Sequence, residues 1–317
     1  MEASRAVVKQ LDHVVARVDD PRAVFSLFTE ALGLPVAWPL ASYPAFESGG
    51  VALGNLYLEI MQCGPRREAS GRGRLCAVAF ESPGIERAVG ELKRRGVPHT
   101  PVAPYVERGG GGARTRIWSN VVLGRLAGRD PLLDAMIMMS RLPGAARMSD
   151  AGAGGWFNRL QLDALMRRNP VFLVEYHYEN FGERPFWAEF GDHDNKRAQD
   201  LARLRASEGG ALGLERVREI VVGVREFDSA RALWSKLYAP APEVSEGVWE
   251  IDDGPALRLV ESDSNSIQSL ALSVSSLERA ETRLRESGMI GTVTGDELTI
   301  NPAKLEGILV RLVQVRR

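Results

Sequence analysis

The feature that most constrains the fold of this chain is a pattern of elements that recurs along it. In residues 11–61 a short apolar strand is followed by an amphipathic helix, a glycine stop and further strands. Alternating or continuous apolar residues indicate the strands, and apolar residues three and four positions apart indicate the helix. Comparable series begin near residues 75, 217 and 267. Because internal repeats determine architecture, we expect four βαβββ modules arranged in two pairs.

The four modules predict two domains, since 317 residues are enough for two cores of ordinary size. We expect an N-terminal domain in residues 1–180 and a C-terminal domain in residues 214–317. Residues 181–213 are expected to link them through a helix at 196–207. His193 lies in the polar turn before that helix, where it would help to cap it.

A long insertion, at about residues 127–169, interrupts the second module. It contains helical patterns near residues 132–142, which are rich in methionine, and near residues 156–168. Long insertions in compact modules often serve as lids or binding loops. The apolar side chains of this one, among them Met136 and Trp156, would either cover a substrate or pack in an ordinary core.

Composition and charge bear on the partners and location of the protein. Hydrophobic residues make up 44% and charged residues 26%, and the net charge of −1 argues against a nucleic-acid or anionic-membrane partner. No apolar run is long enough to span a membrane, and residues 1–10 contain no apolar signal core. The two cysteines, Cys63 and Cys76, form no disulfide framework. A cytoplasmic location is therefore expected.

Three polar residues stand inside apolar strands. His13 lies in LDHVV, Glu59 in LYLEIM, and Glu175 in the strand predicted at residues 170–178. An imidazole or carboxylate in such a strand is costly unless it is paired, hydrogen-bonded or metal-bound. Histidine together with carboxylates suits a divalent metal such as Fe, Mn, Zn, Ni or Co. A hydrogen-bonded His13–Glu59 pair without a metal is the alternative.

The segments LDHVV, ALGLPV and ESGGVALGNLYLEIM resemble the vicinal oxygen chelate superfamily. That group includes glyoxalase I, methylmalonyl-CoA epimerase, extradiol dioxygenases, and the fosfomycin- and bleomycin-resistance proteins. The motif resemblance covers residues 11–61, and the other three modules match in the order of their elements. The resemblance implies an α+β fold in which paired βαβββ modules form half-barrel sheets, four modules making two tandem domains.

The resemblance also implies a metal site on the first and last strands of the paired modules. His13 and Glu59 stand at the corresponding positions of the first module, and Ala77 and Glu175 at those of the second. Because Ala77 cannot bind a metal, and strand alternation places His177 on the same side as Glu175, His177 could supply the missing nitrogen. The expected metal ligands are thus His13, Glu59, Glu175 and His177, with Glu59 or Glu175 as a general base.

The C-terminal modules are expected to be metal-free. The positions that match His13 are Glu219 and Ser269, and the last strands offer no inward carboxylate. The two-domain extradiol dioxygenases carry two histidines and one glutamate in their second half. This departure argues against ordinary catechol cleavage and favours a structural role for the C-terminal half.

Two functions remain open at this stage. The first is a metal-dependent enzyme that acts on a small oxygen-chelating metabolite, aromatic or carbonyl, as a lyase, isomerase or oxygenase. The second is a protein that binds and sequesters a drug or metabolite without chemistry. In both cases the partner is a small molecule, and a homodimer is the candidate assembly.

Overall fold

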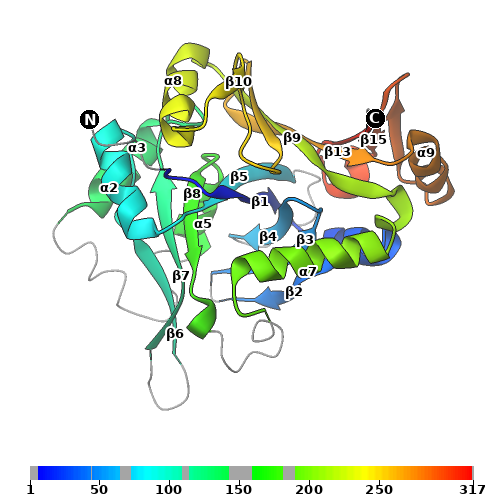
Figure 1. Ribbon diagram of the computed structural model, residues 1–317, viewed down its shortest axis with the longest axis horizontal. Helices are drawn as coiled ribbons and strands as arrows, with labels where there is room; N and C mark the ends of the chain where they lie inside the picture. The colour runs from blue at the N-terminus through cyan, green and yellow to red at the C-terminus, as the bar shows by residue number, and fades with distance from the viewer. Residues whose placement is uncertain are drawn as a thin grey trace.

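The computed structural model shows two curled sheets joined by a helix (Figure 1). None of the described helices is long and apolar enough to cross a membrane. The structure describes residues 6–43, 45–64, 73–108, 114–142, 159–180 and 190–315.

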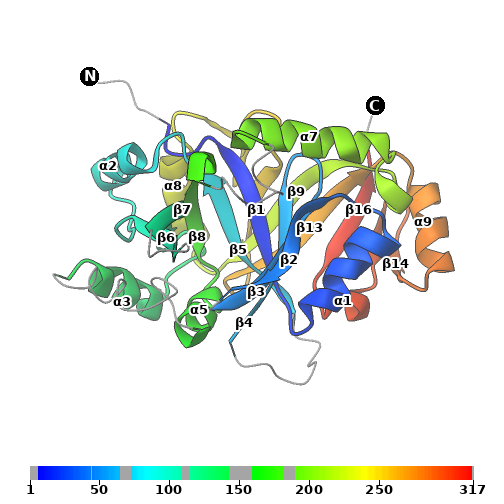
Figure 2. The ribbon, with the colours of Figure 1, turned by 90° about the horizontal axis from the view of Figure 1, so that it is seen from below.

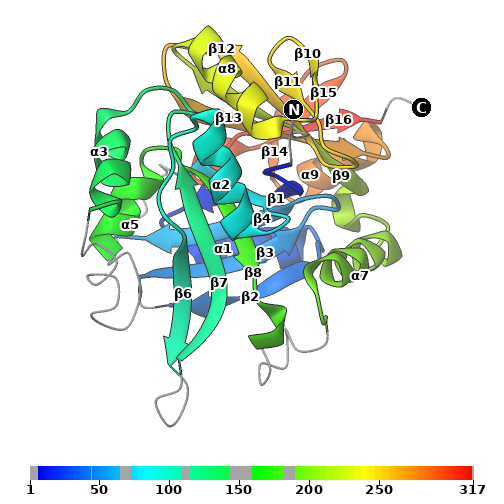
Figure 3. The same cartoon turned by 60° about the vertical axis from the view of Figure 1, so that its left-hand side comes forward.

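The first sheet has eight strands in the order β2-β3-β4-β1-β5-β8-β7-β6. The outer strands β6 and β7 form a long hairpin that projects away from the second sheet (Figure 3). The strands are β1 (Gln10–Arg17), β2 (Val36–Ser42), β3 (Phe46–Ala52), β4 (Tyr57–Cys63), β5 (Arg74–Glu81), β6 (Ala103–Arg108), β7 (Arg114–Leu123) and β8 (Val171–Tyr176).

The second sheet repeats this order as β10-β11-β12-β9-β13-β16-β15-β14. In each sheet the two central strands are antiparallel, and each is also paired in parallel with the last strand of its own module. The predicted fold class, paired βαβββ modules forming half-barrel sheets, is confirmed. The strands are β9 (Leu214–Val224), β10 (Glu243–Ser245), β11 (Val248–Trp249), β12 (Ala256–Glu261), β13 (Ser266–Val274), β14 (Ile290–Val293), β15 (Glu297–Ile300) and β16 (Val310–Gln314).

One helix follows the first strand of each module, and the remaining helices belong to the insertion and the linker. The first of the module helices starts where the sequence indicates, because the Asp20 side chain accepts a hydrogen bond from Ala23 N and Pro21 occupies the first turn. The module helices are α1 (Pro21–Ser26), extended by a π turn η1 (Leu27–Ala31), α2 (Ile85–Arg95), α8 (Phe227–Tyr238) and α9 (Leu277–Glu286). The others are α3 (Pro131–Ser140), α5 (Arg159–Met166) and α7 (His193–Ala206), with short turns η2 (Tyr178–Asn180), η3 (Gly210–Leu212) and η4 (Pro302–Leu305).

Two helices begin at other residues than the sequence indicates. The helix predicted at residues 196–207 is α7, which starts at His193 because the cap is Asp192, whose side chain accepts from Asn195 N. His193 is therefore a helical residue and not a capping one. The helix predicted at residues 156–168 is described from Arg159, and Trp156 lies outside the described residues.

The largest hydrophobic cluster is shared by the two sheets. The Phe80 ring on β5 lies 6.0 Å from Trp234 and 5.6 Å from Tyr238, both on α8. All three side chains are buried, and burying one such side chain stabilises a fold by about 1.5–3 kcal/mol. Helix α7 lies against both β3 and β9 (Figure 2). The domain boundaries at residues 180 and 214 stay predictions.

Candidate functional site

His13 and Glu59 lie together on one face of the first sheet. In the β1–β4 pairing His13 is opposite Tyr57 and Val15 is opposite Glu59, and paired or alternate residues share a face. His13 Nε2 lies 3.3 Å from Glu59 Oε2, and each side chain is 12% exposed. We call this face, which carries His13 and Glu59, the inner face.

Asp12 also reaches the inner face, because β1 contains a β-bulge. The register with β5 shifts between Leu11, paired with Phe80, and His13, paired with Ala79, which leaves Asp12 as an extra residue. Such a bulge re-aims a side chain. The fully buried Asp12 Oδ2 consequently lies 2.6 Å from His13 Nδ1, although the two residues are neighbours in a strand.

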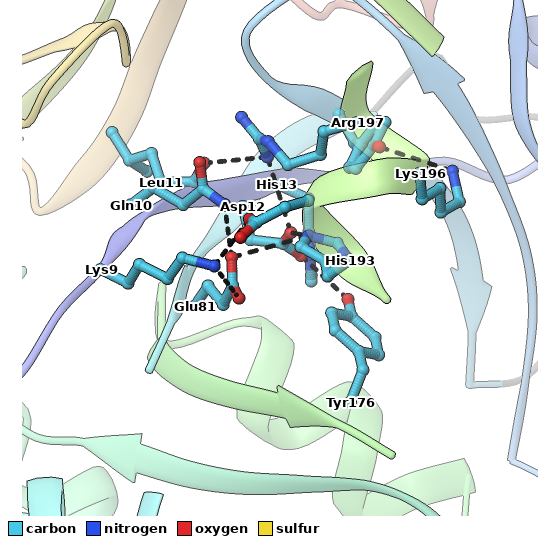
Figure 4. A network of polar contacts seen from close by, with 12 residues as sticks. Lys9, Gln10, Leu11, Asp12, His13, Glu81, Tyr176, His193, Lys196 and Arg197 are labelled. Carbon is cyan, nitrogen blue, oxygen red and sulfur yellow. Dashed lines mark hydrogen bonds and ion pairs between the residues drawn. The ribbon is translucent and has the colours of Figure 1, made fainter. Parts of the chain in front are cut away.

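Helix α7 brings a second histidine to Asp12. His193 Nε2 lies 2.6 Å from Asp12 Oδ1, and its Nδ1 lies 2.8 Å from the Tyr178 hydroxyl. The Tyr176 hydroxyl donates to Asp12 Oδ2 at 2.9 Å, and its ring stacks on that of His193 with centroids 4.9 Å apart. Figure 4 shows His193 and Tyr176 directed at Asp12 from different elements. The sequence gives no local signal for His193, because a long-range contact brings it there.

Charged side chains surround this network toward the surface. Glu81 accepts hydrogen bonds from Lys9, at 2.9 Å, and from Gln10. Lys9 also lies 2.6 Å from Asp194, at the start of α7. Arg197 donates to the Leu11 carbonyl at 3.3 Å, and its Nη1 lies 3.7 Å from Asp12 Oδ1 (Figure 4). The start of α7 is thus tied to the start of β1.

The contacts of Asp12 define which nitrogens carry protons. Burial alone would raise the pKa of Asp12, but the charges and hydrogen bonds of His193 and His13 hold it well below its usual range. An ionised carboxylate only accepts, so His13 donates to it from Nδ1 and His193 from Nε2. Burial lowers the pKa of His13, whereas Asp12 and then Glu59 raise it above its ordinary value overall. His13 therefore favours the imidazolium form, with its Nε2–H toward Glu59.

Glu59 is oriented from its other side by β3 and β2. The Ser48 hydroxyl donates to Glu59 Oε1 at 2.6 Å, and Trp38 Nε1 donates to Ser48 Oγ at 3.4 Å. Gly50 is opposite Glu59, and a Cβ there would lie 2.3 Å from the Trp38 ring. The absent side chain lets the indole lie across the inner face, 6.3 Å from the His13 ring between centroids.

Aromatic rings connect the two edges of the first sheet. Tyr43, directly after edge strand β2, lies 6.4 Å from Tyr105 on edge strand β6 and 6.3 Å from Trp118 on β7. The rings of Tyr105 and Trp118 are stacked, with centroids 4.0 Å apart. Trp118 is paired with Tyr176, so it belongs to the inner face. The sheet therefore curls until aromatic side chains of its opposite edges meet.

Helix α5 of the insertion covers another part of the inner face. Its Leu162 and Met166 form one buried cluster with Val15, Met61 and neighbouring apolar residues. Of the two roles expected of the insertion, α5 shows core packing, at the Met61 end of the inner face, and a role as a lid stays a prediction. Helix α7 packs at the Asp12 end.

Glu175 and His177 lie on the opposite face. Ala79 of β5 is paired with Phe172 of β8, so Phe172 belongs to the inner face and Glu175, three residues later, does not. Glu175 is opposite Ser119, and His177 Nε2 lies 3.1 Å from the Ser119 hydroxyl.

This placement corrects the expectation that four ligands converge. Glu175 and His177 do share a side, as alternation predicts, but it is not the side of His13 and Glu59. The cause is the register between β5 and β8, which makes Phe172 the counterpart of Glu59, as Ala77 is the counterpart of His13.

The residues of the inner face do not fit a resident metal ion. A metal held by a protein usually has at least three protein ligands. His13 Nε2 and Glu59 Oε2 are two suitable donors, whereas their counterparts Ala77 and Phe172 provide none. Among the described residues, no three histidine, cysteine, aspartate or glutamate side chains are grouped as a metal site.

The second sheet carries an ion-pair network at the equivalent positions. Its register places Glu219, Arg258, Ser269 and Arg311 where the first sheet has His13, Glu59, Ala77 and Phe172. Arg258 Nε lies 2.9 Å from Glu219 Oε2, and Arg311 Nη2 lies 2.8 Å from Glu219 Oε1. Burial alone would raise the pKa of Glu219, but these two guanidinium groups lower it. The arginines of the last strands were not anticipated from the sequence.

The bulge is repeated as well. The β9–β13 register shifts between Val217, paired with Leu272, and Glu219, paired with Ala271. Arg218 is therefore the extra residue of the second sheet, at the position that Asp12 has in the first.

Two eight-stranded sheets with the same strand order define a two-domain fold of the vicinal oxygen chelate type. No protein-family model and no curated protein matches the sequence. Among solved structures, homoprotocatechuate 2,3-dioxygenase from Brevibacterium fuscum, in complex with 3,4-dihydroxyphenylacetate, is similar with a TM-score of 0.52 and 12% identity, over 100% of this chain and 83% of that chain. The homoprotocatechuate 2,3-dioxygenase from Arthrobacter globiformis is similar with a TM-score of 0.52 and 12% identity, over 99% of this chain and 82% of that chain. A hypothetical protein from Staphylococcus aureus is similar with a TM-score of 0.51 and 9% identity, over 96% of this chain and 99% of that chain. At these identities the likeness shows the fold.

Proposed function

We propose that the protein is an enzyme of the vicinal oxygen chelate type that transfers protons on a small oxygen-bearing molecule, aromatic or carbonyl. The observation that carries the proposal is His13, which Asp12 holds by Nδ1 while its Nε2 points to Glu59 at 3.3 Å. A buried carboxylate behind a histidine is the arrangement that orients an acid–base imidazole. Both His13 and Glu59 keep 12% of their side chains exposed, so a ligand can reach them.

The chemistry follows from the positions of the two side chains. The imidazolium of His13 can donate a proton to a substrate oxygen, and the carboxylate of Glu59 can accept one from a neighbouring carbon or hydroxyl. Two positioned groups of this kind contribute about 10²–10⁴-fold each to a proton transfer. Because the inner face supplies only two metal donors, the geometry favours isomerase or lyase chemistry over an oxygenase.

Aromatic side chains support a planar substrate. Trp38 lies beside His13, and Trp118, Tyr105 and Tyr43 are grouped where the two edges of the sheet meet. Rings of this kind stack on or pack edge-to-face against an aromatic ligand, with about 0.5–1.5 kcal/mol for each pair beyond the burial of area.

The second candidate is a binding protein without chemistry. The observation that favours it is the apolar character of Ala77 and Phe172, which occupy positions equivalent to His13 and Glu59. In that case a ligand would bind to the aromatic part of the inner face and be released unchanged.

The test uses catechol and hydroxyacetone as probes, one aromatic diol and one hydroxycarbonyl. Quenching of tryptophan fluorescence measures binding, and proton NMR in D₂O measures exchange or conversion of the bound probe. We expect His13→Gln to lower conversion by at least about 100-fold while weakening binding less.

The matched control is His99→Gln, since His99 is also a largely enclosed histidine but bonds to the Val97 carbonyl outside the site. Conversion by the control should equal that of the wild type. Unchanged conversion by His13→Gln contradicts the proposal. Binding of a probe without any conversion by the wild type supports sequestration instead.

A further inference from the structure

Helix α7 belongs to none of the four modules, yet its first residue contacts the site. His193 is 8% exposed and lies 2.6 Å from Asp12 Oδ1. Within the helix, buried Lys196 Nζ lies 2.5 Å from Asp200 Oδ2, and the same ammonium lies 4.5 Å above the Tyr57 ring of β4, which packs the helix against the first sheet. A rigid element therefore delivers His193, which is how sites keep a defined geometry.

The two carboxylate oxygens of Asp12 have different hydrogen-bond partners. Oδ2 accepts from His13 and Tyr176, and Oδ1 accepts from His193. Arg197 lies 3.7 Å from Oδ1, beyond hydrogen-bond distance. Because Asp12 is completely buried, loss of the His193 donor would leave Oδ1 unsatisfied. An unsatisfied buried carboxylate oxygen is costly, so the group would rotate toward Arg197 and away from His13.

His193 is itself fixed in one orientation. The Tyr178 hydroxyl lies 2.8 Å from Nδ1, and Tyr176 stacks on the ring. Since Asp12 can only accept, the proton of His193 must sit on Nε2.

We infer that His193 is a positioning residue that holds Asp12, and through it His13, in the arrangement that proton transfer requires. Its importance for a reaction rests on the proposed function. The geometry can be tested without any substrate. Failure of the positioning role of His193 is therefore distinguishable from failure of the proposed enzymatic function.

The test is low-field proton NMR, which detects protons in short hydrogen bonds to a carboxylate. The wild type should show two such resonances, from His13 Nδ1–H and His193 Nε2–H. Asp12→Asn should lose both. His193→Gln places an amide donor where Nε2 stood, so it should lose only the resonance of residue 193.

The decisive variant is His193→Leu, which removes the donor. We expect loss of the His13 resonance as well, although residue 13 is unchanged. Retention of that resonance at full intensity overturns the inference. His99→Leu is the control, because His99 is buried to a similar extent and should leave both resonances unchanged.

The wild type offers an independent test if His193→Leu does not fold. The ¹⁵N shifts of His193 should show a protonated Nε2. A protonated Nδ1 with an unprotonated Nε2 overturns the inference, because that tautomer cannot donate to Asp12.

Discussion

At the scale of single residues, the Asp12–His13 pair links the stability of the protein to pH. The raised pKa of His13 means that its contribution is fully present below its usual value of 6.5 and is lost as pH rises through the folded-state value. The lowered pKa of Asp12 means that its contribution is fully present above 3.8 and is lost as pH falls through the folded-state value. The pair therefore stabilises the fold fully between these two pH values.

Asp12→Asn should consequently destabilise the protein most within that window. We expect a loss of about 3 kcal/mol in the free energy of unfolding, as for other broken buried pairs. Urea unfolding at several pH values measures it. The difference from wild type should shrink as pH rises above the folded-state pKa of His13. A difference that is the same at all pH values contradicts this reading.

A second prediction concerns the room that Gly50 leaves for Trp38. Gly50→Ala should displace the indole and lower the free energy of unfolding by about 1–3 kcal/mol, because a Cβ would lie 2.3 Å from the ring. Thermal unfolding and the tryptophan emission maximum report it. Gly90→Ala is the control, since Gly90 is an exposed residue of α2 with open space around it, and it should be neutral or stabilising.

The sequence anticipates part of the site for reasons visible at this scale. His13 and Glu59 could be found because each lies within a largely apolar strand. The shared side of Glu175 and His177 follows from alternation, but the side itself depends on how β8 pairs with β5. The role of Asp12 could not be predicted, because regular strand alternation would direct its side chain away from His13 and only the bulge brings the two together. The β5–β8 register and the bulge at Asp12 are not encoded in a window of a few residues.

At the scale of elements, the cap Asp20 together with Pro21 made the start of α1 predictable. The start of α7 was predicted at residue 196, whereas Asp192 caps this helix and it begins at His193. The docking of α7 and α5 on the inner face was not predictable, because it depends on contacts between distant segments.

Helix α5 depends on a buried ion pair in addition to its apolar contacts. Arg17 Nη2 lies 2.6 Å from Asp163 Oδ1. Asp163→Asn should therefore raise amide hydrogen exchange in α5 about tenfold, which corresponds to about 1.4 kcal/mol. The matching change Asp134→Asn, at a more exposed pair with Arg125, should alter exchange in α3 by less. Equal effects on the two helices would show that burial of the pair is unimportant.

At the scale of the whole molecule, the fold could be predicted from the sequence because the same series of elements is repeated along the chain. Four series of the same elements specify two sheets of the same strand order. This holds although the side of the sheet predicted for Glu175 and His177 was wrong. The register then gives each sheet four equivalent positions, with His13 and Glu59 in the first and Glu219, Arg258 and Arg311 in the second. Neither sheet carries the ligand set that the family resemblance implies.

Removal of divalent metal should thus leave the molecule intact. After dialysis against EDTA, the melting temperature should stay within about 1 °C of the untreated protein, since no stabilising ligand is lost. Elemental analysis of the purified protein should find Fe, Mn, Zn, Ni and Co well below one ion per chain. A stoichiometric metal that is lost in His13→Ala would contradict this prediction and would support the hypothesis of a metal-dependent enzyme.

The repeated bulge has a consequence for the history of the chain. Asp12 and Arg218 occupy the same extra position in the two sheets, so a duplication that produced the halves would have copied the bulge with them. An insertion was then unnecessary for the site to arise. Substitutions at inherited positions, which give Asp12, His13 and Glu59 in one sheet and Arg218, Glu219 and Arg258 in the other, would then distinguish the two halves.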